Sequence, residues 1–410
     1  MARVLLGWEI GSDYGHLMRF LALARELSAR GHEPVLALCD LTHVDAILGE
    51  TSFRVFQAPV FMAQVGGLPP PIGFAESLMR LGFLHVPALT GICRAWRSLV
   101  EMVAPRLIIL DYAPTALLAT RGLGVPRVRV GTSFAVPPRT TPMPIYRWWR
   151  PEPPARVEQS ERLVLAGANS ALARLGQPPM QRLSDLLDTD DEMITASPEF
   201  DQYPGRTGGR YWGDLANLEH GVAPVWPIAG AARIFVYLRA QSRDFDVVMQ
   251  ALRRTGAAVL VHAPGVSAKQ VKSHTSADVV FSERPLRMED VRRECDLAIC
   301  HAGSSTVEAL VTAGKPVLML PQHLEQLMTA KRVQQIGAGL AVDFDKPAPD
   351  YRRLIRRLLD EPAFTQAAGM VAQRHAADDD RKLRVARLTD RFEALMGRSK
   401  DARERQAGSE

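Results

Sequence analysis

A polar turn between two apolar runs carries the residues of this chain that are best suited to bind an anion. His301 follows the apolar run DLAIC, and the turn made of Gly303, Ser304, Ser305 and Thr306 then opens a helical pattern. The first amide groups of a helix have no partner within it, and the helix dipole adds about half a positive charge there. Gly303 lets the backbone come close to a ligand, and His301 and the three hydroxyl groups can donate further hydrogen bonds. The turn suits a diphosphate, and it equally suits an ordinary N-capped helix.

A second polar group follows at a spacing that favours a ligand site. The run KPVLMLP predicts another buried strand, and Gln322, His323, Glu325 and Gln326 come directly after it. Ligands of open α/β sheets bind at the carboxyl ends of the strands. The turn and this polar group are therefore predicted to belong to one site.

The turn after the first apolar run of the chain offers a base. Glycines at 11 and 15 permit a tight loop that lacks the GxGxxG spacing of a dinucleotide site, and His16 stands where the next helical pattern begins. An imidazole, with an ordinary pKa of about 6.5, can remove a hydroxyl proton at neutral pH. Asp111 ends the run RLIILD, so both side chains are predicted at one sheet edge, where the carboxylate would orient the imidazole. His16 could instead cap a helix, and Asp111 could be the N-cap of a helix beginning near Pro114.

The stretch from His301 to Gln326 resembles the donor-binding signature of the UDP-glycosyltransferase superfamily. These GT-B enzymes include plant natural-product and bacterial macrolide glycosyltransferases. The residues that carry the resemblance are His301, Gly303, Ser305, Thr306, Gly314, Pro316, Glu325 and Gln326. The resemblance implies that His301 and the Ser/Thr turn hold the diphosphate, and that Glu325 and Gln326 hold sugar hydroxyls. It also implies that His16 is a general base, that Asp111 is its partner, and that transfer inverts the anomeric centre.

Because of two departures from the family pattern, the sequence does not identify the nucleotide of the donor. The ribose-binding Glu of the family would fall at Ala309, but the acid here is Glu308, and one residue on a helix is a rotation of about 100°. Either a locally over- or underwound helix returns Glu308 to the ribose or another group holds the ribose, so UDP- and dTDP-sugars both remain candidates. Glu283 and Leu286 stand where plant members have the Trp and Gln that bind the base. Arg239, after the run RIFVYL, is a further candidate donor-binding residue, as a cation beside the phosphates.

These features predict a metal-independent, inverting glycosyltransferase, a hexosyltransferase without a cofactor, whose co-substrate is a UDP- or dTDP-sugar. The expected acceptor is a hydroxyl of a small hydroxylated, amphipathic or lipid-like molecule. Two alternatives stay open. A nucleotide-sugar 2-epimerase shares the fold but needs acidic groups at the sugar ring in place of the His-Asp pair. A catalytically idle nucleotide-sugar-binding subunit would activate a partner enzyme.

Alternating strand and helix patterns predict an α/β protein with two doubly wound Rossmann-like domains, and the resemblance implies that these face each other across a cleft. We expect an acceptor-binding domain at 1–212, a linker rich in Gly, Pro and Ala at 213–232, and a donor-binding domain at 233–378. An amphipathic helix is expected at 379–398, and in GT-B proteins such a helix crosses back to the first domain. A polar tail is expected at 399–410.

Composition argues against several other classes of protein. The net charge of +5 is small for 410 residues and is spread along the chain, which argues against nucleic-acid binding. No apolar run reaches the length of a membrane span, and MARVLLGWEI enters a strand directly, so a cytoplasmic protein is expected. The four cysteines show no CxxC spacing and predict neither zinc nor disulfides. The Trp- and Arg-rich loop 142–154 is open to three interpretations: a lip of the acceptor pocket, a peripheral contact with a partner or membrane, or simple packing.

Overall fold

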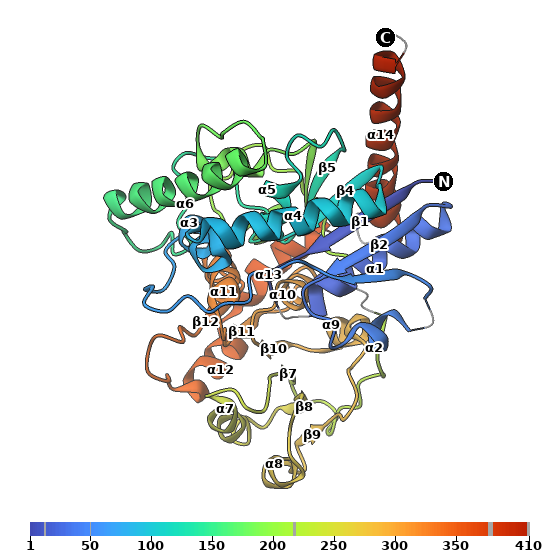
Figure 1. Cartoon of the computed structure of the whole chain (residues 1–410). Helices are drawn as coiled ribbons and strands as arrows, with labels where there is room; N and C mark the ends of the chain where they lie inside the picture. Colours follow the sequence, from blue (N-terminus) through green and yellow to red (C-terminus); the bar gives the residue numbers. More distant parts are fainter. Residues whose placement is uncertain (12–13, 50, 216–218, 376–379, 408–410) are drawn as a thin grey trace. The chain divides into compact units, whose positions relative to one another are not determined.

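The computed structural model of the chain describes residues 1–11, 14–49, 51–215, 219–375 and 380–407 (Figure 1). The chain divides into two compact units. The first unit consists of Met1–Thr195, Tyr203–Leu215 and Lys382–Glu410, and the second of Ala196–Gln202 and Ala216–Arg381.

The first unit is built on a parallel six-stranded sheet in the order β3-β2-β1-β4-β5-β6. Alternate residues of a strand face opposite sides of a sheet. Leu6 therefore packs with α1 on one face, whereas Leu5 packs with α3 to α6 on the other. The elements are β1 (Arg3–Trp8), α1 (Tyr14–Ala29), β2 (Glu33–Leu38), α2 (Val44–Leu48), β3 (Arg54–Gln57), α3 (Phe74–Leu78), η1 (Met79–Phe83), α4 (Val86–Val103), β4 (Leu107–Asp111), α5 (Pro114–Ala119), β5 (Arg127–Gly131), α6 (Pro154–Arg174), η2 (Leu183–Leu187) and β6 (Asp191–Ile194).

The second unit repeats this plan with a parallel sheet in the order β12-β11-β10-β7-β8-β9. One face of the sheet packs on α7 and α12, and the other on α9, α10, α11 and α13. The elements are η3 (Pro198–Phe200), β7 (Arg233–Tyr237), α7 (Phe245–Leu252), β8 (Ala258–His262), α8 (Ala268–His274), β9 (Val279–Phe281), α9 (Met288–Glu294), β10 (Leu297–Cys300), α10 (Ser304–Val311), β11 (Val317–Met319), α11 (Leu324–Ile336), β12 (Gly339–Ala341), α12 (Tyr351–Asp360) and α13 (Pro362–His375). The prediction of two doubly wound α/β sheets is confirmed.

In both sheets, the strands that follow the first strand are added on one side of it and then on the other. β1 lies between β2 and β4, and β7 lies between β8 and β10. The chain leaves such a pair of strands toward opposite sides, which opens a crevice at their carboxyl ends. Asp111 is the last residue of β4 and pairs with Trp8 of β1, and His301 directly follows β10. Strand order therefore brings predicted site residues to the switch point of each sheet.

The unit boundaries differ from the predicted domains in two places. Ala196–Gln202 was predicted inside the first domain but belongs to the second unit, because Phe200 is buried in the core of that unit. The predicted linker at 213–232 is also partly structured, apart from 216–218, which lie outside the described residues. Val222 pairs with Leu286, and Nε1 of Trp226 donates to Glu294 at 2.9 Å. This part of the linker therefore packs on the second unit.

The helix near the end of the chain, α14 (Arg381–Ala407), belongs to the first unit from Lys382 onward. Val385, Leu388 and Phe392 are buried in the core that also contains α1. The predicted helix ended at 398, but α14 continues to Ala407 through most of the predicted polar tail. The residues after Gly397 are good helix formers without proline, and one glycine costs a helix only about 1 kcal/mol.

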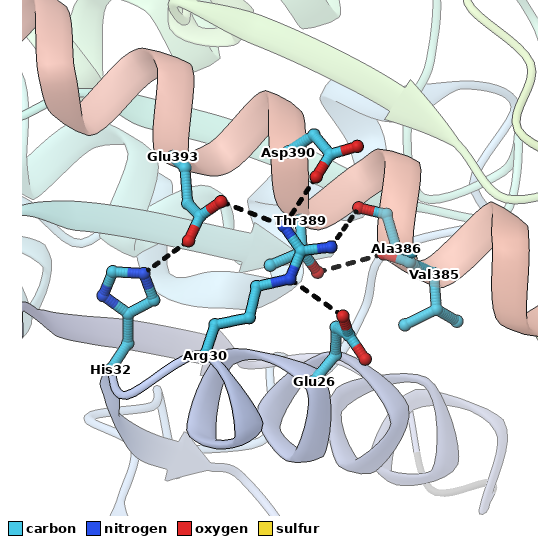
Figure 2. Close-up of polar contacts among 8 residues, drawn as sticks. All are labelled: Glu26, Arg30, His32, Val385, Ala386, Thr389, Asp390 and Glu393. Carbon is cyan, nitrogen blue, oxygen red and sulfur yellow. Dashed lines mark hydrogen bonds and ion pairs between the residues drawn. The ribbon is translucent and has the colours of Figure 1, made fainter.

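A cluster of polar contacts holds α14 against the end of α1 (Figure 2). The guanidinium of Arg30 donates to Glu26 at 2.8 Å, Asp390 at 2.6 Å, Glu393 at 2.9 Å and the carbonyl of Ala386 at 3.0 Å. Nε2 of His32 bonds Glu393 at 2.9 Å. One arginine thus joins two helices that are about 360 residues apart in the sequence.

The loop 142–154 is less exposed than its composition suggests. Tyr146 is buried, and its hydroxyl lies 2.8 Å from the hydroxyl of Ser77. Trp148 and Trp149 are half-buried and contact each other edge to face. These contacts support packing within the first unit, the third of the predicted interpretations.

Candidate active site

The predicted pair of His16 and Asp111 forms at the switch point of the first sheet. His16 lies in the first turn of α1, and its Nδ1 is 2.9 Å from Oδ2 of Asp111. The indole of Trp8 stacks on the imidazole, with ring centroids 5.0 Å apart and planes at 17°. Asp111 is fully buried, so its carboxylate fixes the imidazole where water competes little. The alternative in which Asp111 is a helix N-cap is wrong, because the N-cap of α5 is Ala113.

Arg19 is a third member of this cluster, and no sequence motif predicted it. Its guanidinium pairs with the same Oδ2 that bonds His16, and its Nε donates to Oγ1 of Thr195 at 2.8 Å. Burial alone raises the pKa of Asp111, but the charges of Arg19 and His16 outweigh burial and hold the pKa below its usual range. Asp111 is therefore ionised at neutral pH. The only available signal in the sequence was that Arg19 stands three residues after His16, on the same side of a helix.

Nε2 of His16 is the ring nitrogen left for a substrate. No hydrogen bond to it comes from the residues that the structure describes, whereas Nδ1 is held by Asp111. In a neutral imidazole with Nδ1–H donating to a carboxylate, Nε2 carries the lone pair. The cluster can therefore accept a proton at Nε2 and stabilise the imidazolium through Asp111.

Each switch point also holds a residue in the left-handed backbone region. Tyr112, directly after Asp111, has φ of 43°, and Ala302, directly after His301, has φ of 64°. Residues other than glycine adopt this conformation at a cost of about 1 kcal/mol or more, and such residues gather at functional sites. Both turns direct the chain sharply away from the strand end.

The helix α10 begins where the anion-binding turn was predicted. Gly303 is the N-cap, which offers no side chain of its own, and α10 starts at Ser304. Ser304, Ser305 and Thr306 form the first turn and are partly exposed. The first amide groups of a helix and the positive end of its dipole attract anions, so the position of this turn suits a diphosphate.

His301 makes different contacts from those predicted. Its Nδ1 donates to the carbonyl of Leu320 at 2.8 Å, and its Nε2 accepts the backbone N–H of Arg239 at 2.8 Å. These two bonds fix the tautomer with the proton on Nδ1. Donation to a phosphate requires a ring N–H that this tautomer does not offer. His301 instead joins the ends of three neighbouring strands, β7, β10 and β11, and the exposed Arg239 is positioned through its backbone.

Glu308 contacts a distant part of the second unit. It is buried, and its Oε1 accepts the backbone N–H of Ser197 at 3.0 Å and the hydroxyl of Ser197 at 2.5 Å. The physical reason is the one-residue offset from position 309, which turns the carboxylate toward the segment Ala196–Gln202. Oε1 of Glu308 is thus held by Ser197, and the ribose contact stays a prediction.

The remaining predicted donor residues lie at the start of α11. Oε1 of Gln326 accepts the backbone N–H of Gln322 at 2.8 Å, so this side chain closes the turn before the helix. Glu325 is half-buried, and its carbonyl accepts Nε2 of Gln202 at 3.1 Å. Upstream, Glu283 is exposed, whereas Leu286 is buried in the core and is therefore not a stacking surface for a base.

The described residues contain neither a metal cluster nor a membrane-spanning helix. No group of three or more His, Cys, Asp or Glu side chains in the described ranges could hold a metal ion. Within those same ranges, no helix has the length and apolar character needed to cross a membrane. The four cysteines, all described, are free.

Comparisons with known proteins agree with the two-sheet architecture. Residues 246–388 match the family "Erythromycin biosynthesis protein CIII-like, C-terminal domain". An L-demethylnoviosyl transferase of Streptomyces niveus is 26% identical over 392 residues, which cover 89% of this chain and 95% of that protein. Among solved structures, CalG4, the calicheamicin glycosyltransferase, is similar with a TM-score of 0.72 and 18% identity over 97% of this chain and 98% of CalG4. The glycosyltransferase VinC, solved in complex with dTDP, is similar with a TM-score of 0.63 and 18% identity over 97% of this chain and all of VinC. The structural likeness establishes the GT-B fold.

Proposed function

Because the chain belongs to the UDP-glycosyltransferase superfamily and is a glycosyltransferase, we propose that it inverts the transferred sugar, with His16 as general base and Asp111 as its orienting partner. The donor is a UDP- or dTDP-sugar, and the acceptor is a hydroxyl of a small hydroxylated or amphipathic molecule. One observation carries the proposal: the bond from His16 Nδ1 to the buried Asp111, which leaves Nε2 for the acceptor.

The proposed step is a single displacement. Nε2 of His16 takes the acceptor proton while the acceptor oxygen forms a bond to the anomeric carbon. The bond between this carbon and the diphosphate oxygen breaks, and the nucleoside diphosphate leaves with the bonding electrons. Attack from the face opposite the leaving group inverts the configuration. Asp111 stays ionised and stabilises the imidazolium.

The first turn of α10 supports a donor site in the second unit. This helix N-terminus, with Gly303 as N-cap, suits the diphosphate and the negative charge that develops as the sugar leaves, so we propose that the reaction needs no metal. VinC was solved with dTDP, which supports a nucleoside diphosphate as the ligand. Because Glu308 is committed to Ser197, we expect dTDP, which lacks the 2′-hydroxyl, to bind at least as tightly as UDP.

The test begins with binding of UDP and dTDP by calorimetry, followed by transfer from UDP-glucose and dTDP-glucose to a panel of phenols and macrolide alcohols, read by mass spectrometry in the presence of EDTA. We expect His16→Ala to lower turnover by a factor of about 10² to 10⁴ and to leave nucleotide affinity unchanged. An equally active variant would remove His16 from the mechanism.

The donor site is tested by charge. Ser304→Glu places a carboxylate at the start of α10, where it stabilises the helix but repels a diphosphate, so we expect a folded protein with nucleotide affinity at least about tenfold weaker. Lys269→Glu, in the exposed first turn of α8, is the matched control and should bind as the wild type does. Equal affinity in both variants would mean that the diphosphate binds elsewhere.

The same assay separates the alternatives. A 2-epimerase would release free nucleotide and an altered sugar and would form no glycoside. An idle binding subunit would bind nucleotide without turning over any donor, and His16→Ala would leave its stimulation of a partner enzyme unchanged.

A further inference from the structure

The chain leaves the first unit at a residue that contacts Arg19. Thr195 is the last residue of the first unit before this crossing, and Ala196–Gln202 belong to the second unit. We propose that Thr195, Ala196 and Ser197 form a tether that couples the position of helix α10 to the orientation of Asp111. In this proposal Arg19 and Glu308 are positioning residues at the two ends of the tether. The proposal rests on the proposed function, because it assigns a purpose to donor binding at α10.

The first end of the tether is fixed to the catalytic pair. Oγ1 of Thr195 accepts Nε–H of Arg19 at 2.8 Å, and the guanidinium of Arg19 also pairs with Oδ2 of Asp111. The three side chains are buried. Since the same Oδ2 bonds His16, a shift of Thr195 reaches the imidazole through one guanidinium and one carboxylate.

The other end is fixed to α10. Oε1 of Glu308 accepts both the backbone N–H and the hydroxyl of Ser197, at 3.0 and 2.5 Å. Both residues are buried, where hydrogen bonds to a charged group are worth more than in water. Glu308 stands one helical turn after Ser304, so the two lie on the same side of α10. A ligand that binds the first turn of α10 and shifts this helix therefore also shifts Glu308, which holds Ser197.

The rest of the segment is attached to the second unit at several points. The carboxylate of Glu199 pairs with Arg374 at 2.9 Å and with His375 at 3.1 Å. The hydrogen bond from His375 lowers the pKa of Glu199 to about 2. Nε2 of Gln202 donates to Oγ1 of Thr329 at 3.0 Å. The segment is thus held as a piece of the second unit, and only two peptide bonds separate Ser197 from Thr195.

This arrangement gives Glu308 a task that differs from the ribose contact predicted from the sequence. A ribose ligand changes the affinity for the nucleotide, and its loss affects UDP more than 2′-deoxy-UDP. A tether changes how well the base is oriented once the donor is bound. Misplacing a catalytic group by about 1 Å costs up to about 10² in rate, so the tether predicts an effect on kcat with little effect on Kd.

The experiment compares Glu308→Gln, Thr195→Val and the double variant in the full-length enzyme. Each single change should lower kcat about tenfold and change the Kd values for UDP and 2′-deoxy-UDP by less than about twofold. The double variant should be no slower than either single variant, because both changes break one connection. A selective loss of UDP affinity in Glu308→Gln would identify Glu308 as a ribose ligand and overturn the tether, and so would independent, multiplicative effects on kcat.

Glu199→Gln is the matched control, since it removes another carboxylate contact of the same segment without touching Ser197 or Thr195. It should lower the melting temperature and leave kcat within about twofold of the wild type. A loss of kcat equal to that of Glu308→Gln would show that general loosening of the segment explains both.

Hydrogen exchange supplies a readout that does not depend on turnover. Glu308→Gln should speed amide exchange in the first turns of α1, around His16 and Arg19, and Glu199→Gln should not. If the wild type transfers no sugar, the proposed function fails, yet this exchange pattern still tests the tether. Unchanged exchange in α1 would overturn it.

Discussion

Gly11 lies so close to His16 that a methyl group on Gly11 would stand 2.7 Å from Nε2 of the imidazole. The backbone of Gly11 also has φ of 111°, a region that residues with a Cβ rarely adopt. A methyl group on Gly11 would also stand 3.6 Å from Nε1 of Trp8, whose indole stacks on the imidazole, so Gly11 lies beside both rings. Gly11 keeps the proton-accepting edge of the base free of a side chain.

Gly11→Ala should reduce transfer by at least about tenfold, because the new methyl group forces the imidazole away from its position beside Asp111. Gly15→Ala is the matched control from the same turn, since a Cβ there meets nothing within 4 Å. Alanine also favours the helix over glycine by about 1 kcal/mol. Steady-state kinetics and melting temperatures of both variants test the relationship, and full activity of Gly11→Ala would contradict it.

Glu9 is a buried carboxylate that joins the end of β1 to the start of α5. Its Oε1 accepts the hydroxyl of Thr115 at 2.8 Å and the backbone N–H of Ala116 at 2.6 Å, and its Oε2 accepts the backbone N–H of Thr115 at 2.9 Å. Burial outweighs these hydrogen bonds and raises the pKa of Glu9 from 4.5 to about 7. The folded protein therefore binds a proton at Glu9 more tightly than the unfolded chain does.

A raised carboxyl pKa makes stability fall as the pH rises from about 4.5 to about 7, because only the folded state keeps the proton in this window. Glu9 should cost the first unit up to about 3 kcal/mol across the window, and its contribution should be constant above pH 7. Glu9→Gln removes the titration but keeps an oxygen acceptor. The free energy of unfolding should be measured in urea at pH 5, 6, 7 and 8. From pH 5 to pH 7, that of the wild type should fall relative to that of Glu9→Gln. Parallel curves would mean that Glu9 titrates normally.

The sequence was sufficient to predict the elements that follow a strand directly. Asp111 ends an apolar run, and His16 and the turn from Gly303 to Thr306 follow such runs within a few residues, so parallel strands deliver them to one edge of their sheet. For the same reason both doubly wound sheets could be predicted from the alternation of strand and helix patterns. The roles of these residues in catalysis and donor binding remain predictions.

The sequence could not predict the hydrogen-bond and ion-pair partners of the site residues. These partners lie far away in the sequence or are backbone groups. Arg19 meets Asp111 across 92 positions, and Glu308 meets Ser197 across 111. The partners of His301 are a carbonyl and an amide, which every residue has and no motif marks. The boundary of the second unit at Ala196–Gln202 could not be predicted for a similar reason. It depends on the packing of Phe200 and is not marked by a change in composition.

Arg30 provides the last prediction, because its guanidinium joins the end of α1 to Asp390 and Glu393 of α14 (Figure 2). The hydrogen bond to Asp390 is the main reason that its pKa lies above the usual range. Arg30→Gln loses the ion pairs with Glu26, Asp390 and Glu393 and leaves these acids close together. We expect a loss of about 1 kcal/mol in the free energy of unfolding, since partly exposed ion-pair networks are screened by water and salt.

Arg54→Gln is the control, because the Arg54–Glu33 pair is exposed and long at 3.5 Å. In calorimetry, Arg30→Gln should melt at a lower temperature than the wild type. This difference in melting temperature should become smaller in 1 M NaCl, because salt screens the ion pairs. Arg54→Gln should melt at the same temperature as the wild type. Equal melting temperatures for Arg30→Gln and the wild type would mean that the apolar face of α14 alone holds the helix in place.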